Sequence, residues 1–257
     1  MEKIMTIGSM TGIDWAGCSY FSTLREGGVS LGAWDGLNLG AHCHDQAAAV
    51  AENRARLRLD LPADPFWLTQ VHGVRVVDAD VASSAAPEAD AAVSTAVNRV
   101  LAILTADCLP VVISDYRGSV LGVAHAGWRG LAAGVLEATL DSMQAKRPDH
   151  GRLRAWIGPA ISQRHFEVGA EVLEAMLAKD ADAAIYFVPA DIPGKYHADL
   201  AGLARLFLTR NSPKGIDVML SGECTFERND RYYSYRRHAI TGRLATVAWL
   251  LPPRHSA

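Results

Sequence analysis

The sequence predicts an α+β protein, because its strand signals occur in neighbouring pairs and its helix signals occur separately, without strict strand–helix alternation. Short apolar runs bounded by Gly, Pro or Asp predict the strands, and apolar residues at helical spacing predict the helices. No internal repeat and no long Ser/Gly/Pro linker divides the 257 residues. A chain of this length can bury a full core, so we expect a single domain over residues 1–257.

The first half of the chain carries one helix and most of the expected strands. A helix is predicted at residues 47–59, after Asp45. Two extended runs follow, interrupted at Gly73, and an alanine-rich stretch after them predicts a surface loop. Three strands come next, the last two joined by a turn at residues 116–119. The runs are residues 65–70 and 74–80, the loop is 81–92, and the strands are 100–107, 109–115 and 120–126.

The second half carries three predicted helices and ends in a pair of predicted strands. Residues 130–146 predict a helix, because Leu131, Val135, Leu136, Leu140 and Met143 form one apolar stripe. The same spacing predicts helices at 167–178 and at 200–208, the second with Asp199 placed to cap it. Strands at 231–237 and 243–251 flank the turn at Thr241-Gly242.

Composition excludes several classes of partner. The formal net charge of -3 gives no electrostatic reason to expect nucleic acid or an anionic membrane. No run approaches the apolar length of a membrane span, and the first twenty residues lack a signal-peptide core. The four cysteines, Cys18, Cys43, Cys108 and Cys224, show no paired spacing. We therefore expect reduced thiols and a cytoplasmic location.

The stretch TADCLPV, residues 105–111, interrupts an aliphatic region with a carboxylate, a thiol and a proline. A buried carboxylate needs a partner, and proline forbids a ladder hydrogen bond inside a sheet. Two further stretches, TQVHG and AHAGWRG, likewise place one metal-type ligand where a strand is expected to end. The three ligands are His72, Cys108 and His125, separated by 36 and 17 residues.

Two imidazoles and one thiolate suit a catalytic zinc with a fourth position open to water. Zinc would lower the pKa of that water to about 7, and Cu²⁺ could occupy the same ligands. Taken singly, a cysteine in an apolar run is an ordinary core residue and a histidine after a strand an ordinary loop residue. An edge-strand bulge with a packed thiol is the structural alternative for residues 105–111.

The stretch GWRG opens a predicted helix, and helix starts bind anions through free backbone N–H groups. Arg129 and Gly130 therefore form a candidate anion site next to His125. Gly73 and Gly127 allow the backbone to turn sharply or approach a ligand closely.

Seven blocks of the sequence together resemble the bacterial laccase-domain family, also called the polyphenol-oxidase or peptidoglycan-editing-factor family. The resemblance covers residues 21–250, and it implies layered mixed sheets flanked by helices, similar to the fold of toxin cysteine deamidases. It also implies a zinc held by His72, Cys108 and His125. The family often has one or two cysteines where this chain has residues 162–165, and the sequence gives no reason to place a metal at His165. The blocks are GGVSLGAWDGLNLG, WLTQVHG, TADCLPV, AHAGWRGLAAGVLEAT, WIGPAI, FEVGAEV and YYSYRRHAITGR.

The resemblance implies purine nucleoside phosphorylase activity on adenosine, inosine and methylthioadenosine, together with hydrolytic deamination of adenosine. Zinc-activated water attacks the base in other deaminases with the help of a carboxylate that is not a ligand, and Asp107 is the nearest candidate. Phosphorolysis needs a phosphate held in line with the sugar carbon. The candidates for that task are Arg129, Gly130, Arg54 and Arg236, the last with its neighbour Arg237.

Three alternatives stay open. Cys108 could be the nucleophile of an amidase that edits peptidoglycan precursors, with His125 or His72 as base. A polyphenol oxidase with a single copper on the zinc ligands is the second alternative. A multicopper laccase would need more histidines than a chain with nine of them and one H-x-H pair supplies. A non-catalytic metal-binding protein would bind metal without turnover. The sequence leaves a homodimer open.

Overall fold

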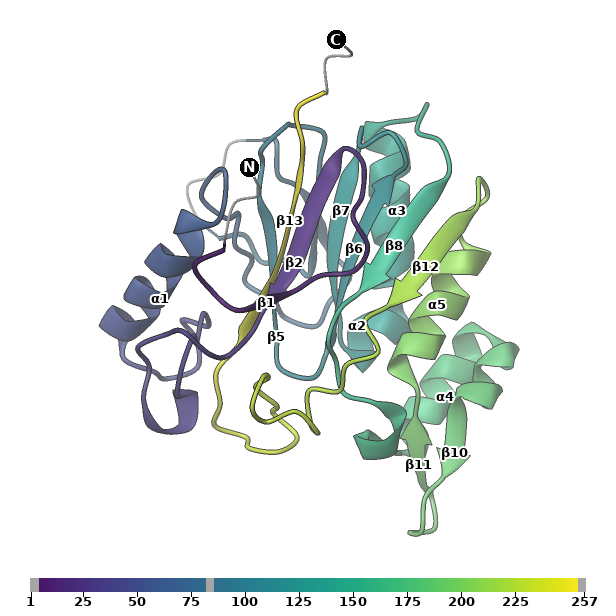
Figure 1. Cartoon of the computed structure of the whole chain (residues 1–257). Coiled ribbons are helices and arrows are strands. Elements are labelled where there is room, and N and C mark those ends of the chain that lie inside the picture. Colours follow the sequence, from purple (N-terminus) through teal and green to yellow (C-terminus); the bar gives the residue numbers. More distant parts are fainter. Residues whose placement is uncertain (1–4, 82–85, 254–257) are drawn as a thin grey trace.

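The computed structural model describes residues 5–81 and 86–253. Two β-sheets pack face to face, and helices cover their outer faces (Figure 1). Residues from both sheets, among them Tyr20, Ile103, Val112 and Val123, form the apolar layer between them. The predicted α+β class is confirmed, and the layered arrangement implied by the family resemblance is present.

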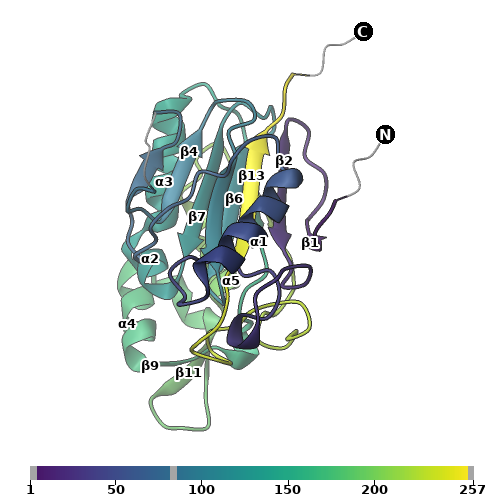
Figure 2. The same cartoon turned by 90° about the vertical axis from the view of Figure 1, so that its left-hand side faces the viewer.

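The smaller of these two sheets is antiparallel and four-stranded. Its strand order is β1-β2-β13-β5. The single helix α1 (Ala47–Leu59) covers its outer face and crosses in front of β13 when viewed from that side (Figure 2). Leu57 of α1 packs with Phe21 and Val247 in the apolar cluster on this face. The strands are β1 (Ser9–Met10), β2 (Cys18–Thr23), β13 (Leu244–Leu250) and β5 (Leu101–Thr105).

The larger sheet is mixed and six-stranded. Its order is β12-β8-β6-β7-β4-β3, with parallel pairing between β12 and β8 and between β3 and β4. The central strand β6 is buried along its whole length, and the residues at its middle, 111–113, are all aliphatic. The strands are β12 (Ile216–Leu220), β8 (Leu153–Ile157), β6 (Leu109–Asp115), β7 (Leu121–Ala126), β4 (Ala91–Ser94) and β3 (Val76–Asp78).

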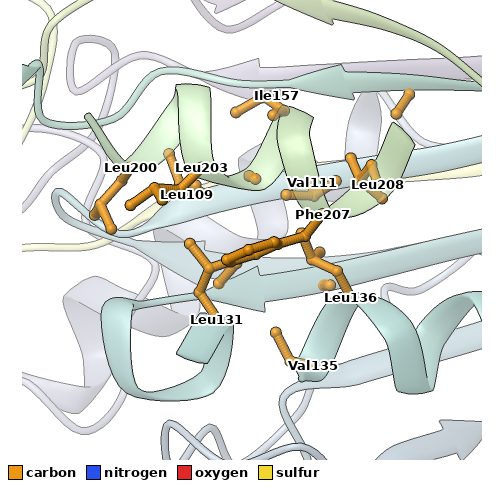
Figure 3. Close-up of a cluster of buried hydrophobic side chains, with 14 of the residues drawn as sticks. Leu109, Val111, Leu131, Val135, Leu136, Ile157, Leu200, Leu203, Phe207 and Leu208 are labelled. Carbon is orange, nitrogen blue, oxygen red and sulfur yellow. The ribbon is translucent and has the colours of Figure 1, made fainter. Parts of the chain in front are cut away.

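Four helices and a small sheet pack on the other side of the six-stranded sheet. Phe207 of α5 lies beside Leu131 and Leu136, and Leu109 and Val111 of β6 belong to the same cluster (Figure 3). Burying one such aromatic side chain contributes about 1.5–3 kcal/mol. The helices are α2 (Trp128–Ala133), α3 (Val135–Lys146), α4 (Ala170–Lys179) and α5 (Leu200–Arg210). The small antiparallel sheet consists of β10 (Phe187–Pro189), β11 (Lys195–Ala198) and β9 (Glu167–Gly169).

Several predicted elements are confirmed. The helix at 47–59 and the strands within 100–107, 109–115, 120–126 and 243–251 are present. The helix predicted at 200–208 extends to Arg210, and the Asp199 side chain accepts a hydrogen bond from the backbone N–H of Gly202, as a helix cap does.

Two predicted helices begin or end differently. The helix expected at 130–146 is two helices, because Gly134 adopts the left-handed conformation (φ 103°) between α2 and α3. The helix expected at 167–178 begins only at Ala170, since residues 167–169 pair with β11 as β9.

Three predictions for extended or loop segments are wrong. Residues 65–70 do not form a strand. They make two isolated β-bridges, one from Phe66 to Leu101 and one from Thr69 to Glu88. Residues 231–237 form turns and irregular chain instead of a strand, with Tyr232 and Tyr233 both fully buried. The surface loop expected at 81–92 ends earlier, since β4 begins at Ala91 and is buried; residues 82–85 of it lie outside the described residues. Strands β2, β8 and β12 were not predicted.

Within the described part of the chain, no helix has the length and apolar character that crossing a membrane requires.

Candidate functional site

The chain passes from one sheet to the other at the TADC segment. It leaves the four-stranded sheet at Thr105 and enters the six-stranded sheet at Leu109. Asp107 makes the turn with a left-handed backbone (φ 94°), and Pro110 stands at the second residue of β6, near a strand start where proline is tolerated. The polar interruption in the sequence is therefore a crossing between sheets, and it places Cys108 at the end of both.

His125 lies on β7, opposite Pro110 of the neighbouring strand. Its ring is buried, and its Nδ1 lies 2.8 Å from Oδ1 of Asp90. A carboxylate on one ring nitrogen fixes the orientation of an imidazole and leaves the other nitrogen for a ligand. Asp90 was not predicted as a site residue, although a carboxylate in an alanine-rich stretch is itself a sign of a buried acceptor.

Asp90 also shapes the loop that carries His72. Its two carboxylate oxygens accept hydrogen bonds from the backbone N–H groups of Val71, His72 and Gly73 at 2.7–3.1 Å. His72 has a left-handed backbone (φ 62°), a conformation that is costly away from glycine and needs such support. One buried carboxylate thus sets the position of both histidines.

His72, Cys108 and His125 converge on one point. Their ligand atoms all lie within 4.8 Å of one another, and the His72 Nε2 to Cys108 Sγ distance is 3.8 Å. Gly127 lies directly behind them: a Cβ there would be 2.7 Å from Cδ2 of His72 and 3.1 Å from Cys108 Sγ. Two imidazoles and a thiolate are a ligand set that zinc accepts, so the residues present fit a metal.

The protonation of this cluster favours a thiolate. Burial alone would raise the pKa of Cys108, but hydrogen bonds from His125 and His72 lower it to about 6. Burial alone would lower the pKa of His125, whereas Asp90 and Cys108 raise it to about 9. The thiolate is the form of cysteine that binds metals and also the form that acts as a nucleophile.

A cavity of about 500 Å³ adjoins the cluster and is lined by all three ligands. Its size falls within the usual range for small-molecule sites. Arg129, Arg236 and Arg243 line it as well, and none of them pairs with a carboxylate among residues 5–81 and 86–253. Phe166 and Tyr235 add aromatic surface. The cavity therefore combines a metal-type cluster, positive charge and aromatic walls.

Asp107 lines this cavity, but its carboxylate is already engaged. It accepts hydrogen bonds from the Thr225 hydroxyl at 2.6 Å, the Ser234 hydroxyl at 3.0 Å and the backbone N–H of Arg236 at 2.7 Å. It thereby fixes the segment that carries Arg236 and Tyr235 against the cavity. Its role as acid–base group stays a prediction.

The structure brings two of the four candidate phosphate residues to the cavity wall. Arg129 lies over the Trp128 ring, and the Arg236 guanidinium donates to the carbonyl of Glu167. Arg54 does not line the cavity; it donates to the Leu39 carbonyl and stacks on a tryptophan ring. Gly130 is buried inside α2, where a Cβ would lie 3.0 Å from the Gly73 carbonyl oxygen. Arg237 donates to backbone carbonyls outside the cavity lining.

Several residues that line the cavity were not predicted from the sequence. His42 and Arg243 reach the cavity from loops, and Phe166 and Tyr235 come from the FEVGAEV and YYSYRRHAITGR blocks. Burial, followed by the charges of Arg243 and Arg54, lowers the pKa of His42. The His42-Cys43-His44 triplet was a visible signal, but nothing local connects it to residues 72–125.

Nearly the whole chain is similar in sequence to known proteins. Residues 19–251 match the family described as multi-copper polyphenol oxidoreductase laccase. A Pseudomonas aeruginosa protein named as a purine nucleoside phosphorylase is 48% identical over 228 residues, 89% of this chain and 91% of that one. YfiH of Escherichia coli, which carries the same activity in its name, is 45% identical over 238 residues, 91% of this chain and 95% of that one.

Solved structures agree in fold. A Neisseria meningitidis protein described as a member of DUF152 superposes with a TM-score of 0.85 at 39% identity, covering 96% of this chain and 100% of the other. A Bacillus licheniformis YfiH superposes with a TM-score of 0.80 at 27% identity, covering 91% and 92%. The resemblance stated from the motifs is confirmed: this chain belongs to the laccase-like YfiH/DUF152 family.

Proposed function

We propose that this protein is a zinc-dependent purine nucleoside phosphorylase of the cytoplasm that acts on adenosine, inosine and methylthioadenosine and also deaminates adenosine. The names of the Pseudomonas and Escherichia relatives support the phosphorylase. The observation that carries the proposal is the cavity in which His72, Cys108 and His125 share a wall with three arginines. Such a cavity suits two substrates, a purine nucleoside and the phosphate anion.

Phosphate recognition is assigned to Arg129, Arg236 and Arg243. A guanidinium that lacks a carboxylate partner keeps its charge for an incoming oxyanion, and in Arg236 and Arg243 one of the guanidinium nitrogens already donates to backbone carbonyls. Arg236 is positioned by a hydrogen bond from its backbone N–H to Asp107 and from its side chain to the carbonyl of Glu167. Holding phosphate in one orientation converts its attack on the sugar into a step within a complex.

The purine is assigned to the aromatic part of the cavity. Phe166 and Tyr235 offer flat surfaces for a base, as aromatic side chains do in many sites that bind nucleobases. Zinc on His72, Cys108 and His125 would supply Lewis acidity toward the base and toward water. In deamination we keep Asp107 as the residue that exchanges protons with the leaving ammonia.

The deciding experiment incubates metal-analysed protein with adenosine, with and without phosphate, and identifies the products. Adenine formed only with phosphate supports phosphorolysis, and inosine supports deamination. Cys108→Ala is expected to lose both bound metal and turnover, while Cys43→Ala, at a cysteine outside the cavity lining, keeps both. An active, zinc-loaded Cys108→Ala protein refutes the proposal.

One observation favours a second candidate, a thiol-dependent amidase. The pKa of Cys108 is lowered to about 6 beside two histidines, which is the arrangement of an activated cysteine nucleophile. A thiolate bound to a metal is not free to attack a carbonyl carbon. If metal-free protein releases an amino acid from a peptidoglycan precursor and iodoacetamide abolishes that release, the amidase is correct. Inactivation by a chelator contradicts it.

A further inference from the structure

A second set of metal-type side chains lies outside the cavity. The His165 imidazole, the Cys224 thiol and the Glu227 carboxylate place one ligand atom each within 4.8 Å of the other two. None of the three lines the cavity of His72, Cys108 and His125. We call these three residues the second cluster.

The second cluster joins two segments that meet only through the fold. His165 ends the short 3-10 helix Gln163–His165, and Cys224 and Glu227 lie on a turn after β12. A single bridge pairs the backbone of Cys224 with Ala160, including a hydrogen bond from the Thr225 N–H to the Ala160 carbonyl. The positions of these ligands are therefore set by backbone contacts and not only by their own side chains.

Each ligand is also oriented. The Ser162 backbone N–H donates to Cys224 Sγ at 3.4 Å, and His165 Nε2 lies 2.8 Å from the nearer Glu227 oxygen. The His165 ring stacks on Phe226 with centroids 4.5 Å apart. Cys224 is buried, whereas His165 and Glu227 are partly exposed, so a small ion has access from one side.

We propose that His165, Cys224 and Glu227 bind a second divalent transition metal, with Zn²⁺ as the best fit. Bonds of about 2.0–2.3 Å in a tetrahedral site put neighbouring ligand atoms roughly 3.4–3.8 Å apart, which these side chains reach by rotamer adjustment. A thiolate, a carboxylate and a neutral imidazole balance a dication, and the mixed soft and hard donors suit zinc. Binding releases the thiol proton and any proton shared by His165 and Glu227 to solvent.

The second cluster lies behind the cavity wall. Thr225, next to Cys224, donates to Asp107 of the cavity at 2.6 Å, and Arg236 of the cavity donates to the His165 carbonyl at 3.3 Å. A metal here fastens the 162–166 segment to the 224–227 turn, and both segments support cavity residues. None of its ligands lines the cavity, so we assign it the task of holding these two segments together, with water in the fourth coordination position.

The test uses Cys108→Ala protein. In this protein the first cluster, formed by His72, Cys108 and His125, has lost its thiolate. Co²⁺ is titrated into metal-free protein, and the sulfur-to-cobalt charge-transfer absorption in the near ultraviolet reports thiolate ligation. We expect one equivalent to give this band and Zn²⁺ to displace it. Adding Cys224→Ala removes the band, and adding Cys43→Ala instead leaves it unchanged.

Glu227→Gln is the companion variant, because its side chain is half exposed and the change removes one charge without removing volume. It is expected to weaken Co²⁺ binding about tenfold or more in protein whose unfolding temperature without metal is unaltered. No charge-transfer band in Cys108→Ala protein overturns the proposal. So does a band that survives Cys224→Ala or disappears with Cys43→Ala.

Discussion

Gly127→Ala offers a direct test of the three-ligand site, because the glycine is required by the cluster and not by the backbone. Gly127 has φ -66° and ψ 160°, values that alanine adopts without strain. The added Cβ, however, would stand 2.7 Å from Cδ2 of His72 and 3.1 Å from Cys108 Sγ. Carbon atoms in contact normally lie about 3.5–4.0 Å apart, so the imidazole must retreat by about 1 Å.

That displacement is large on the scale of metal coordination. Ligand distances in a functioning site vary by about 0.2 Å, and a misplacement of 1 Å costs a reaction about 100-fold. We expect Gly127→Ala to lose zinc affinity and at least about 100-fold in kcat/KM. The loss of folding stability should be about 1 kcal/mol or less, as for an N-cap change from glycine to alanine.

The assay combines zinc content after dialysis, phosphorolysis of inosine and urea denaturation. Gly151→Ala is the matched control, because a Cβ at Gly151 meets no described atom within 4 Å; its zinc content and rate should equal those of the unaltered protein. If Gly127→Ala retains full zinc content and full activity, the three side chains do not act together as the structure places them.

Three further perturbations test the surroundings of the site. Asp90→Asn leaves at least one backbone N–H of the His72 loop without an acceptor and should cost about 1–3 kcal/mol in urea denaturation, with zinc affinity roughly 10–100-fold weaker in a competition titration. Arg129→Gln should raise the KM for phosphate roughly 10- to 100-fold, equivalent to a charged hydrogen bond of about 1.5–3 kcal/mol, with unchanged zinc content; an unchanged KM removes Arg129 from the phosphate site. Burial alone would raise the pKa of Asp80, but hydrogen bonds from Lys146 and Ser94 and from residue 95 lower it from 3.8 to about 2. The charge of Asp80 therefore stabilises the fold above pH 3.8, and this stabilisation is lost as the pH falls through about 2. The Asp80→Asn protein should accordingly be less stable than the unaltered protein at pH 7 and nearly equal to it at pH 2.

The candidate ligands that the fold brings together could be singled out from the sequence because their chemistry is carried by residue type. His72, Cys108 and His125 are unusual where they stand, each at the end of an apolar run, and metal ligation is the simplest use of two imidazoles and a thiol together. The central strands β6 and β7 were equally predictable, since both are mostly apolar and the turn between them is short.

The other parts of the fold and of the cavity depend on tertiary contacts that leave no local pattern in the sequence. Strand β12 pairs in parallel with β8 across about 60 residues of chain. Ile216 and Val218 favour a strand, but the five residues IDVML carry no sign of their distant partner. Arg243 and His42 reach the cavity from opposite ends of the sequence. Residues 231–237 have the composition of a strand, yet they form turns and irregular chain in which Tyr232 and Tyr233 are buried.

The family description and the names of the relatives suggest different chemistry, and the arrangement of ligands bears on which one this chain can perform. Electron transfer in a multicopper oxidase requires several copper ions close together, held mainly by histidines. The described residues instead form two separate clusters of three ligands, with two histidines in one and a single histidine in the other. No methionine lines the described cavity at His72, Cys108 and His125, whereas a blue-copper centre uses an axial methionine. Arg129, Arg236 and Arg243 line the same cavity, and positive charge beside a Lewis-acidic metal would stabilise the charge of an attacking phosphate. The lining is therefore better suited to the group transfer that we propose than to multicopper oxidation.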